Sequence, residues 1–178
     1  MKRINQYISE KLKIAKNNSK NNLIHVNTLE ELQNEIKTRM ITKNKEVLDL
    51  TDISLSENIT SLALLFTNKS NIKSIDVTGW NVSNVKNMTE MFYYCTSLEE
   101  VIGLDTWDTS SCESFRKMFY DCNNLEICDV EKWNIDSLKD CAYMFKNCNK
   151  LSLDLTHWDL SNIKHIQINR NSNISISE

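Results

Sequence analysis

Residues 76–98 read DVTGWNVSNVKNMTEMFYYCTSL, and the chain returns to this pattern about every 26 residues. Each copy has a Trp followed by Asn or Asp, and these residues are Trp80, Trp107, Trp133 and Trp158. Three copies continue with Met-Phe-x-x-Cys-x-x-Leu, which begins at Met91, Met118 and Met144. A period of roughly 20 to 50 residues is typical of solenoids, whose units bury their apolar sides by stacking on one another. The sequence therefore predicts a stacked repeat architecture.

The spacing of apolar residues changes within a copy and predicts two kinds of element. Before the Trp the pattern is Leu-x-x-Leu-x-Leu, as in Leu125, Cys128 and Val130, which is typical of a short strand. After the Trp, apolar residues recur at intervals of three and four, which predicts a helix over Val85–Cys95. Residues three positions after each Trp are suited to cap that helix: Ser83, Ser110, Asp136 and Ser161. We therefore expect an α/β solenoid of leucine-rich-repeat-like strand-turn-helix units.

The repeats are expected to fill residues 45–166. Asp49–Ile53 looks like a degenerate copy of Asp76–Trp80, so the first copy begins near residue 45. After Trp158 the Met-Phe pair is missing, as expected for a terminal repeat that must not expose its core. Residues 167–178 are therefore interpreted as a C-terminal cap or tail, with an alternating pattern that allows one strand.

Residues 1–44 are interpreted as an N-terminal cap region. We expect a short basic amphipathic helix over residues 1–16, a polar linker, and a strand at Leu23–Val26. Thr28 and Glu31 then form a capping-box pattern that opens a second helix. The apolar stripe of that helix is Leu29, Leu32, Ile36 and Met40.

Composition gives weaker constraints. The chain has 178 residues, of which 40% are hydrophobic and 25% charged, as in an ordinary globular protein. The net charge of -3 is unevenly spread, because residues 1–22 carry about +5. We find no apolar stretch of about 18 residues and no secretory signal, so the expected location is the cytoplasm or a larger particle.

The pattern at residues 76–98 closely resembles the repeat of the BspA-like leucine-rich-repeat family, often described as bacterial surface proteins. The resemblance covers roughly residues 45–166, and its motif is specific because Trp, Met-Phe, Cys and Leu recur together. It implies a leucine-rich-repeat-like solenoid that is used for binding, in a family known from bacteria and their phages.

The six cysteines favour a structural role over metal binding or a disulfide. Cys95, Cys122 and Cys148 occupy one repeat position, and no Cys-x-x-Cys pair is present. The other three stand where neighbouring copies have Val85, Ile75 and Met88: Cys112, Cys128 and Cys141. We therefore expect buried, reduced thiols and no cofactor, with a metal or a disulfide as the less favoured alternatives.

Two columns of polar residues favour turn stabilisation. Asp76, Asp129 and Asp154 each precede a Trp by four, and Asp49 holds the matching place. Stacked carboxylates of this kind could bind calcium, but an Asp beside a turn more often accepts from backbone N–H groups. The second column follows each Trp directly and is interpreted in the same way: Asn81, Asp108, Asn134 and Asp159.

The sequence contains no recognisable catalytic site. His25, His157 and His165 match no catalytic signature, and two glycines exclude a Gly-rich phosphate loop. The Trp column is expected to pack between copies, with a sugar or peptide platform as the alternative. The basic N-terminal helix is expected to be a solvated face, with contact to an anionic membrane or nucleic acid as the alternative.

We therefore expect a non-enzymatic protein-protein interaction module. Its binding residues are expected at exposed strand positions that lean acidic and so favour a basic protein partner: Lys73, Glu99, Glu100, Glu126, Asp129 and Asp154. No nucleic acid is expected as a partner. The alternative is a structural or accessory component of a phage or bacterial assembly, docked through the basic N-terminal arm. A carbohydrate or cation binder ranks third.

Overall fold

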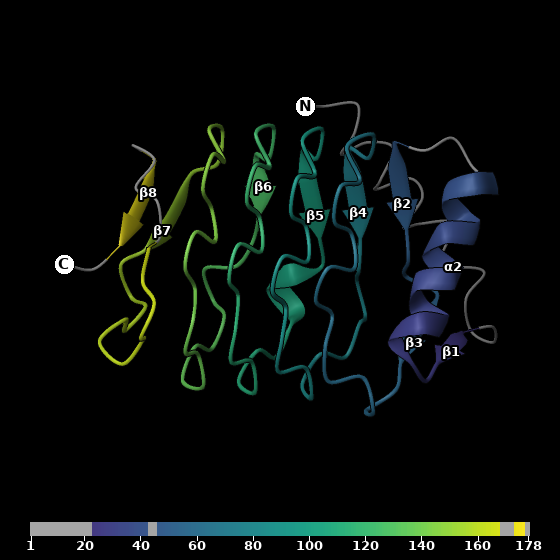
Figure 1. The fold of residues 1–178 in the computed structure, drawn as a ribbon, viewed down its shortest axis with the longest axis horizontal. Coiled ribbons are helices and arrows are strands. Elements are labelled where there is room, and N and C mark those ends of the chain that lie inside the picture. Colours follow the sequence, from purple (N-terminus) through teal and green to yellow (C-terminus); the bar gives the residue numbers. More distant parts are fainter. Residues whose placement is uncertain (1–22, 43–45, 168–172, 177–178) are drawn as a thin grey trace.

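The computed structural model describes residues 23–42, 46–167 and 173–176 of the chain. Its strands have two or three residues each and stand side by side along the molecule (Figure 1). All their pairings are parallel. The strands are β1 Ile24–Val26, β2 Val47–Asp49, β3 Ile53–Leu55, β4 Ser74–Asp76, β5 Glu100–Ile102, β6 Ile127–Cys128, β7 Leu153–Leu155 and β8 Ile174–Ile176.

The strands of successive copies form one ladder in the order β2-β4-β5-β6. Its register places Leu48, Ile75, Val101 and Cys128 beside one another, and all four side chains are buried. Two further pairs, β1-β3 and β7-β8, lie toward the two ends (Figure 1). Parallel short strands in sequential ladders are consistent with the repeat fold that the sequence period predicts.

Each copy returns along a second side, which has its own ladder of parallel bridges. This return side joins Ser61 to Asn87, Asn87 to Ser114, Ser114 to Asp140 and Asp140 to His165. Successive partners are 25 to 27 positions apart, so the alignment read from the sequence is confirmed. Phe66 also stacks on Phe92 of the next copy, which places it in the column of the Met-Phe pairs.

The helix predicted over Val85–Cys95 is wrong, because this segment is a series of turns. The N–H groups of Val85, Met91 and Cys95 each donate to the carbonyl three residues earlier. Between these turns, the N–H groups of Phe92 and Tyr94 donate to the next copy. Ser83 does not cap a helix either, since its N–H donates to Asn81 Oδ1 at 3.1 Å.

Left-handed residues explain why these turns cannot continue as a helix. Glu90 and Tyr94 have φ angles of 56° and 58°, outside the right-handed helical region. Four successive copies have such a pair at the same two positions. The other members are Leu64 and Asn68, Lys117 and Asp121, and Tyr143 and Asn147.

The core is a set of columns that run along the stack. Phe92 stacks on Phe66 and on Phe119, with ring centroids 5.1 and 5.0 Å apart, and Phe119 stacks on Phe145 at 5.6 Å. All four rings are fully buried. Each copy thus completes the core of the copy before it.

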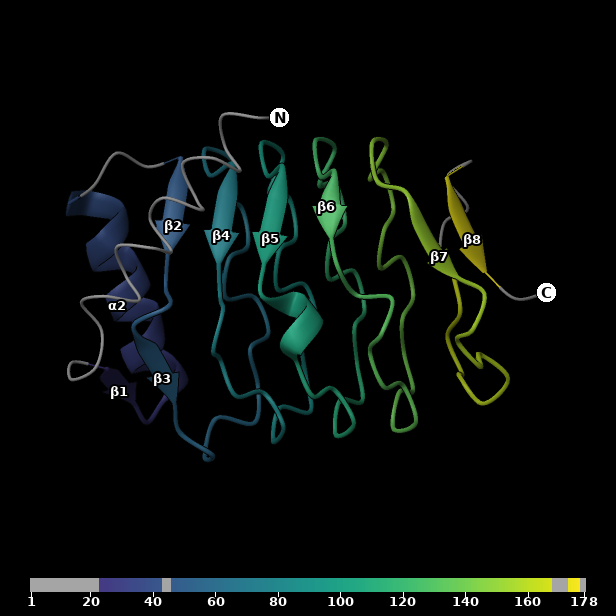
Figure 2. The same cartoon turned by 180° about the vertical axis from the view of Figure 1, so that it is seen from behind.

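The helix α2, Leu29–Thr42, lies at one end of the stack beside β1 and β3 (Figures 1 and 2). Its predicted capping box is confirmed, since Glu31 N donates to Thr28 Oγ1 at 3.1 Å while the Glu31 carboxylate accepts from Asn27 N. Leu32 and Ile36 of its predicted stripe are buried. It is the only α-helix among the described residues, and the helix predicted at residues 1–16 lies outside them.

The other predicted end elements are also present. β1 forms within the expected strand at 23–26, and β8 is the expected single strand near the C-terminus.

A 3-10 turn, Leu104–Thr106, follows Gly103 in the copy with the longest spacer between the Leu of one copy and the next Trp. Gly103 has a φ of 93°, and a Cβ there would lie 2.6 Å from Thr78 Cα, so this turn needs glycine.

Candidate functional site

The predicted binding strip, which includes Lys73 among its acidic residues, contains a ladder of charged side chains. Lys73, Glu99 and Glu126 stack through backbone hydrogen bonds, as expected for one repeat position. Lys73 Nζ lies 2.9 Å from Glu46, and Glu126 Oε1 lies 3.2 Å from Lys150 Nζ. Lys73 and Glu126 are therefore paired, and the pair with Lys150 reduces the acidic charge of the strip at Glu126.

Glu100 was expected to be exposed, and this prediction is wrong. It is 5% exposed, because it stands in the ladder between Ser74 and Ile127, and its Oε1 has no hydrogen-bond partner among the described residues. Burial raises its pKa, and the nearby Ser74 side chain partly opposes this shift. Asp129 and Asp154 are exposed as expected.

The Asp and Asn columns stabilise turns, as predicted, except that Asp129 accepts no such hydrogen bond among the described residues. Asp49, Asp76 and Asp154 each accept the N–H of the Thr two residues later, at 3.0 to 3.1 Å. The second column does the same for the residue three after each Trp, since Asn81, Asp108, Asn134 and Asp159 all accept at 2.8 to 3.1 Å. One oxygen of each of these side chains therefore accepts a hydrogen bond from the chain's own backbone.

The cysteines are free and buried, as expected for structural thiols. Cys95, Cys122 and Cys148 donate to the carbonyl oxygen of the preceding copy's Phe, at 3.0 to 3.1 Å. Burial raises the pKa of Cys95 and Cys148 to about 12. Neutral thiols of this kind are poor nucleophiles and poor metal ligands.

The Trp column packs between copies, as predicted. The indole N–H groups of Trp80, Trp133 and Trp158 donate to carbonyl oxygens of the preceding copy, at 2.8 to 3.2 Å. Trp107 follows the 3-10 turn directly, and its buried N–H has no partner among the described residues. All four side chains are buried, which disfavours the alternative of an exposed indole platform.

Sequence reasoning missed an aromatic and cationic cluster on the return side. We call it the tyrosine-lysine surface, and it consists of Tyr93, Tyr94, Lys117, Tyr120, Tyr143 and Lys146. The rings of Tyr93 and Tyr94 lie 4.6 Å apart, and Tyr120 of the next copy lies 5.1 Å from Tyr93. Tyr94 is 41% exposed. The signal was present in the sequence, because neighbouring copies carry aromatic residues just after the Met-Phe pair.

Two lysines lie over these rings. Lys117 Nζ is 5.5 Å from the Tyr93 centroid, and Lys146 Nζ is 5.4 and 5.3 Å from those of Tyr120 and Tyr143. Such cation-π contacts attract the ammonium groups to the ring faces, and Lys117 Nζ also donates to Glu90 Oε1 at 3.4 Å. The surface therefore offers apolar ring area together with hydrogen-bond donors.

A crevice opens where the strand ladder is interrupted. β6 and β7 belong to different sheets, and Figure 1 shows β7 and β8 inclined to the preceding strands. Glu131 joins the two copies instead, because its Oε1 accepts from Asp154 N and its carbonyl oxygen accepts from Trp158 Nε1. On the return side the same two copies remain paired through the parallel bridge between Asp140 and His165. We call this opening the terminal crevice.

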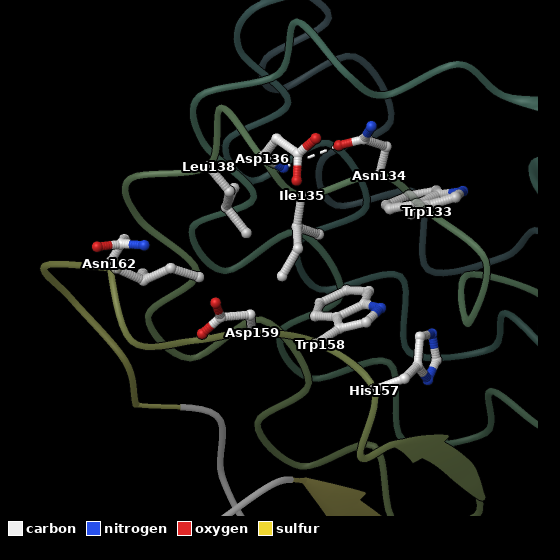
Figure 3. A pocket seen from close by; sticks show the side chains of 10 residues that line it. Trp133, Asn134, Ile135, Asp136, Leu138, His157, Trp158, Asp159 and Asn162 are labelled. Carbon is white, nitrogen blue, oxygen red and sulfur yellow. Dashed lines mark hydrogen bonds between the residues drawn. The ribbon is translucent and has the colours of Figure 1, made fainter.

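The terminal crevice has a volume of about 340 Å³ and lies between the turns that follow Trp133 and Trp158. Figure 3 shows Ile135 and Leu138 of one copy pointing toward Trp158 of the next. Its charged and titratable lining residues are Asp136, Asp159 and His157. The His157 ring is hydrogen-bonded to Glu131 O.

The remaining histidines do not assemble a centre. His25 is exposed in β1, and His165 is exposed on the return side. Within residues 23–42, 46–167 and 173–176, no three His, Cys, Asp or Glu residues are grouped so that they could hold a metal ion. In the same part of the chain, no helix is long and apolar enough to cross a membrane.

Comparison with known proteins places the chain in a family. No curated protein and no solved structure matches it. One family, described as Mycoplasma protein of unknown function (DUF285), matches residues 60–176, which span most of the described copies. The chain therefore belongs to the DUF285 family.

Proposed function

We propose that the chain is a non-enzymatic protein-protein interaction module built on a BspA-like leucine-rich-repeat solenoid. The Trp, Met-Phe, Cys and Leu pattern supports the solenoid, as do parallel strands that repeat in register. Solenoids present extended surfaces on which several copies contribute to one binding site. The cytoplasmic location expected from the sequence stays a prediction.

The observation that carries this proposal is the tyrosine-lysine surface. It spans three successive copies, and Tyr94 and Tyr120 stack across two of them at 6.0 Å. Tyr is enriched at the centres of protein interfaces, because its ring adds apolar area and its hydroxyl adds a hydrogen bond. The left-handed backbone at Tyr94 and the stacking on the next copy hold the rings in place, so little side-chain entropy is lost on binding.

The charged ladder of Lys73, Glu99 and Glu126, with Asp129 and Asp154, stays the second proposed binding surface. A basic partner fits its unpaired carboxylates, but the ion pair between Glu126 and Lys150 weakens the attraction. The tyrosine-lysine surface is therefore the first choice for the recognition site.

The experiment compares three variants of the full chain in affinity capture from cells that express it, followed by mass spectrometry. The first variant is Tyr94→Asn with Tyr120→Thr, which uses the residues that Asn68 and Thr67 supply at the same repeat positions. It should weaken capture of the partner by roughly tenfold or more while the protein stays folded. The second variant reverses the charges of Glu99, Glu126 and Asp129, and it should leave capture largely intact.

The third variant lacks residues 1–16 and tests the alternative, an assembly component docked through its basic arm. The alternative rests on six Lys and Arg residues against one Glu within residues 1–22. Loss of capture on this deletion, with full capture by the tyrosine variant, would favour the alternative. Loss on charge reversal alone would return recognition to the charged ladder.

A further inference from the structure

The terminal crevice differs from the rest of the stack in its charge. Asp136 stands where the other copies have Ser83, Ser110 and Ser161. Ser83 and Ser110 turn their hydroxyls back to the residue two positions earlier, at 2.8 and 2.7 Å. Asp136 keeps the backbone part of this turn, because its N–H donates to Asn134 Oδ1 at 2.8 Å. Its carboxylate has no hydrogen-bond or ion-pair partner within the described residues.

Asp159 adds a second carboxylate to the same crevice. Hydrogen bonds from the Ser161 side chain and from the Ser161 N–H, which donates at 3.0 Å, lower the pKa of Asp159. The group is therefore ionised at neutral pH and keeps further lone pairs for a ligand. Neither lysine nor arginine lines the crevice, so both charges can act on an incoming group.

Apolar side chains form the rest of the crevice. Ile135 and Leu138 face the Trp158 indole across the opening (Figure 3), and Trp133 lies beside them. A lysine or arginine side chain has the matching structure, because an apolar stem carries a charged head. Indole rings also attract cations through their faces.

We propose that the terminal crevice binds the side chain of a lysine or arginine presented by a partner protein. The stem packs against Ile135 and Leu138, and the ammonium or guanidinium group lies between Asp136 and Asp159. This site is separate from the tyrosine-lysine surface, so the two proposals can fail independently.

The test is an NMR titration of the full-length protein with three capped tripeptides, which carry arginine, norleucine or glutamate between two glycines. The arginine peptide should shift the indole N–H signal of Trp158 and the methyl signals of Ile135. The norleucine peptide keeps the stem without the charge and should bind roughly tenfold more weakly, and the glutamate peptide should not bind. The tyrosine variant described above should bind the arginine peptide as the wild type does.

The decisive variant is Asp136→Ser with Asp159→Asn. Both residues occur at the same positions in other copies, as Ser83 and Asn81, so the turns are retained. The variant should bind the arginine peptide roughly tenfold more weakly. Asp108→Asn is the matched control, because it makes the Asp159 change in a copy outside the crevice and should have no effect.

Three results would overturn the proposal. One is equal binding of the arginine and norleucine peptides, which would leave a merely apolar crevice. Another is wild-type affinity in the Asp136 and Asp159 variant. The last is the absence of any shift at Trp158 and Ile135 at the highest soluble peptide concentration.

Discussion

Replacing Phe119 with alanine is expected to lower the free energy of unfolding by about 3–5 kcal/mol. The ring is fully buried and stacks on Phe92 at 5.0 Å and on Phe145 at 5.6 Å, so its removal leaves a cavity between two copies. For a chain of this length the expected fall in melting temperature is roughly 6–20 °C.

Phe119 and Phe145 differ in their positions along the column of stacked rings. Phe145 stacks on Phe119 but on no further ring among the described residues, whereas Phe119 has a ring on either side. One aromatic pair is worth about 0.5–1.5 kcal/mol beyond its buried area, so Phe145→Ala should be less damaging by about that amount.

Urea unfolding followed by circular dichroism measures these differences. Tyr120→Thr is the control, because it removes a half-buried ring and leaves a residue that the chain uses in the same column as Thr67. It should cost clearly less than Phe119→Ala. A Phe119→Ala protein within about 1 kcal/mol of the wild type would refute the column of stacked rings.

Two further predictions concern buried titratable groups. Burial raises the thiol pKa of Cys95 and Cys148 to about 12. Thiol labelling at pH 8 should therefore be slow in the native protein and complete in denaturant. Fast labelling of the native protein would contradict the burial of these thiols. Burial also raises the pKa of Glu100, so the stability linked to its neutral form is present below the unfolded pKa and lost as pH rises through the folded pKa. Glu100→Gln should therefore stabilise the protein more at pH 7 than at pH 4 in thermal melts, and an equal effect at both pH values would show that Glu100 is not desolvated.

The repeat itself could be predicted from the sequence, because its markers are large core residues at fixed offsets. Trp80, Phe92 and Cys95 each contact a residue of the preceding copy, so any shift in alignment would misplace these contacts along the whole stack. The turn role of the Asp and Asn residues could also be predicted, because these side chains form hydrogen bonds with nearby backbone groups in any fold.

The helix predicted within each repeat failed because successive turns and a helix share their apolar spacing. In both, a side chain points inward about every third or fourth residue, as from Val85 to Cys95. The difference lies in the left-handed conformation of Glu90 and Tyr94, and neither residue type signals it as glycine would.

The details of the binding surfaces could not be predicted from the sequence, because they depend on contacts between residues that are distant in sequence. The burial of Glu100 follows from its place between strands of two other copies. The ion pair of Lys73 with Glu46 joins residues 27 positions apart. The crevice lies between two copies whose strands β6 and β7 are in different sheets, and no local pattern marks that interruption.

The paired left-handed residues make the copies energetically dependent on one another. A non-glycine residue in this conformation costs roughly 1–2 kcal/mol, so a pair such as Glu90 and Tyr94 costs its copy roughly 2–4 kcal/mol. The backbone groups that offset this cost are on the next copy, where Arg116 and Tyr120 accept the N–H groups of Glu90 and Tyr94. An isolated copy would carry the conformational penalty without its compensation. Unfolding should therefore be cooperative across neighbouring copies, and the stack should have a minimum length below which no copy is folded.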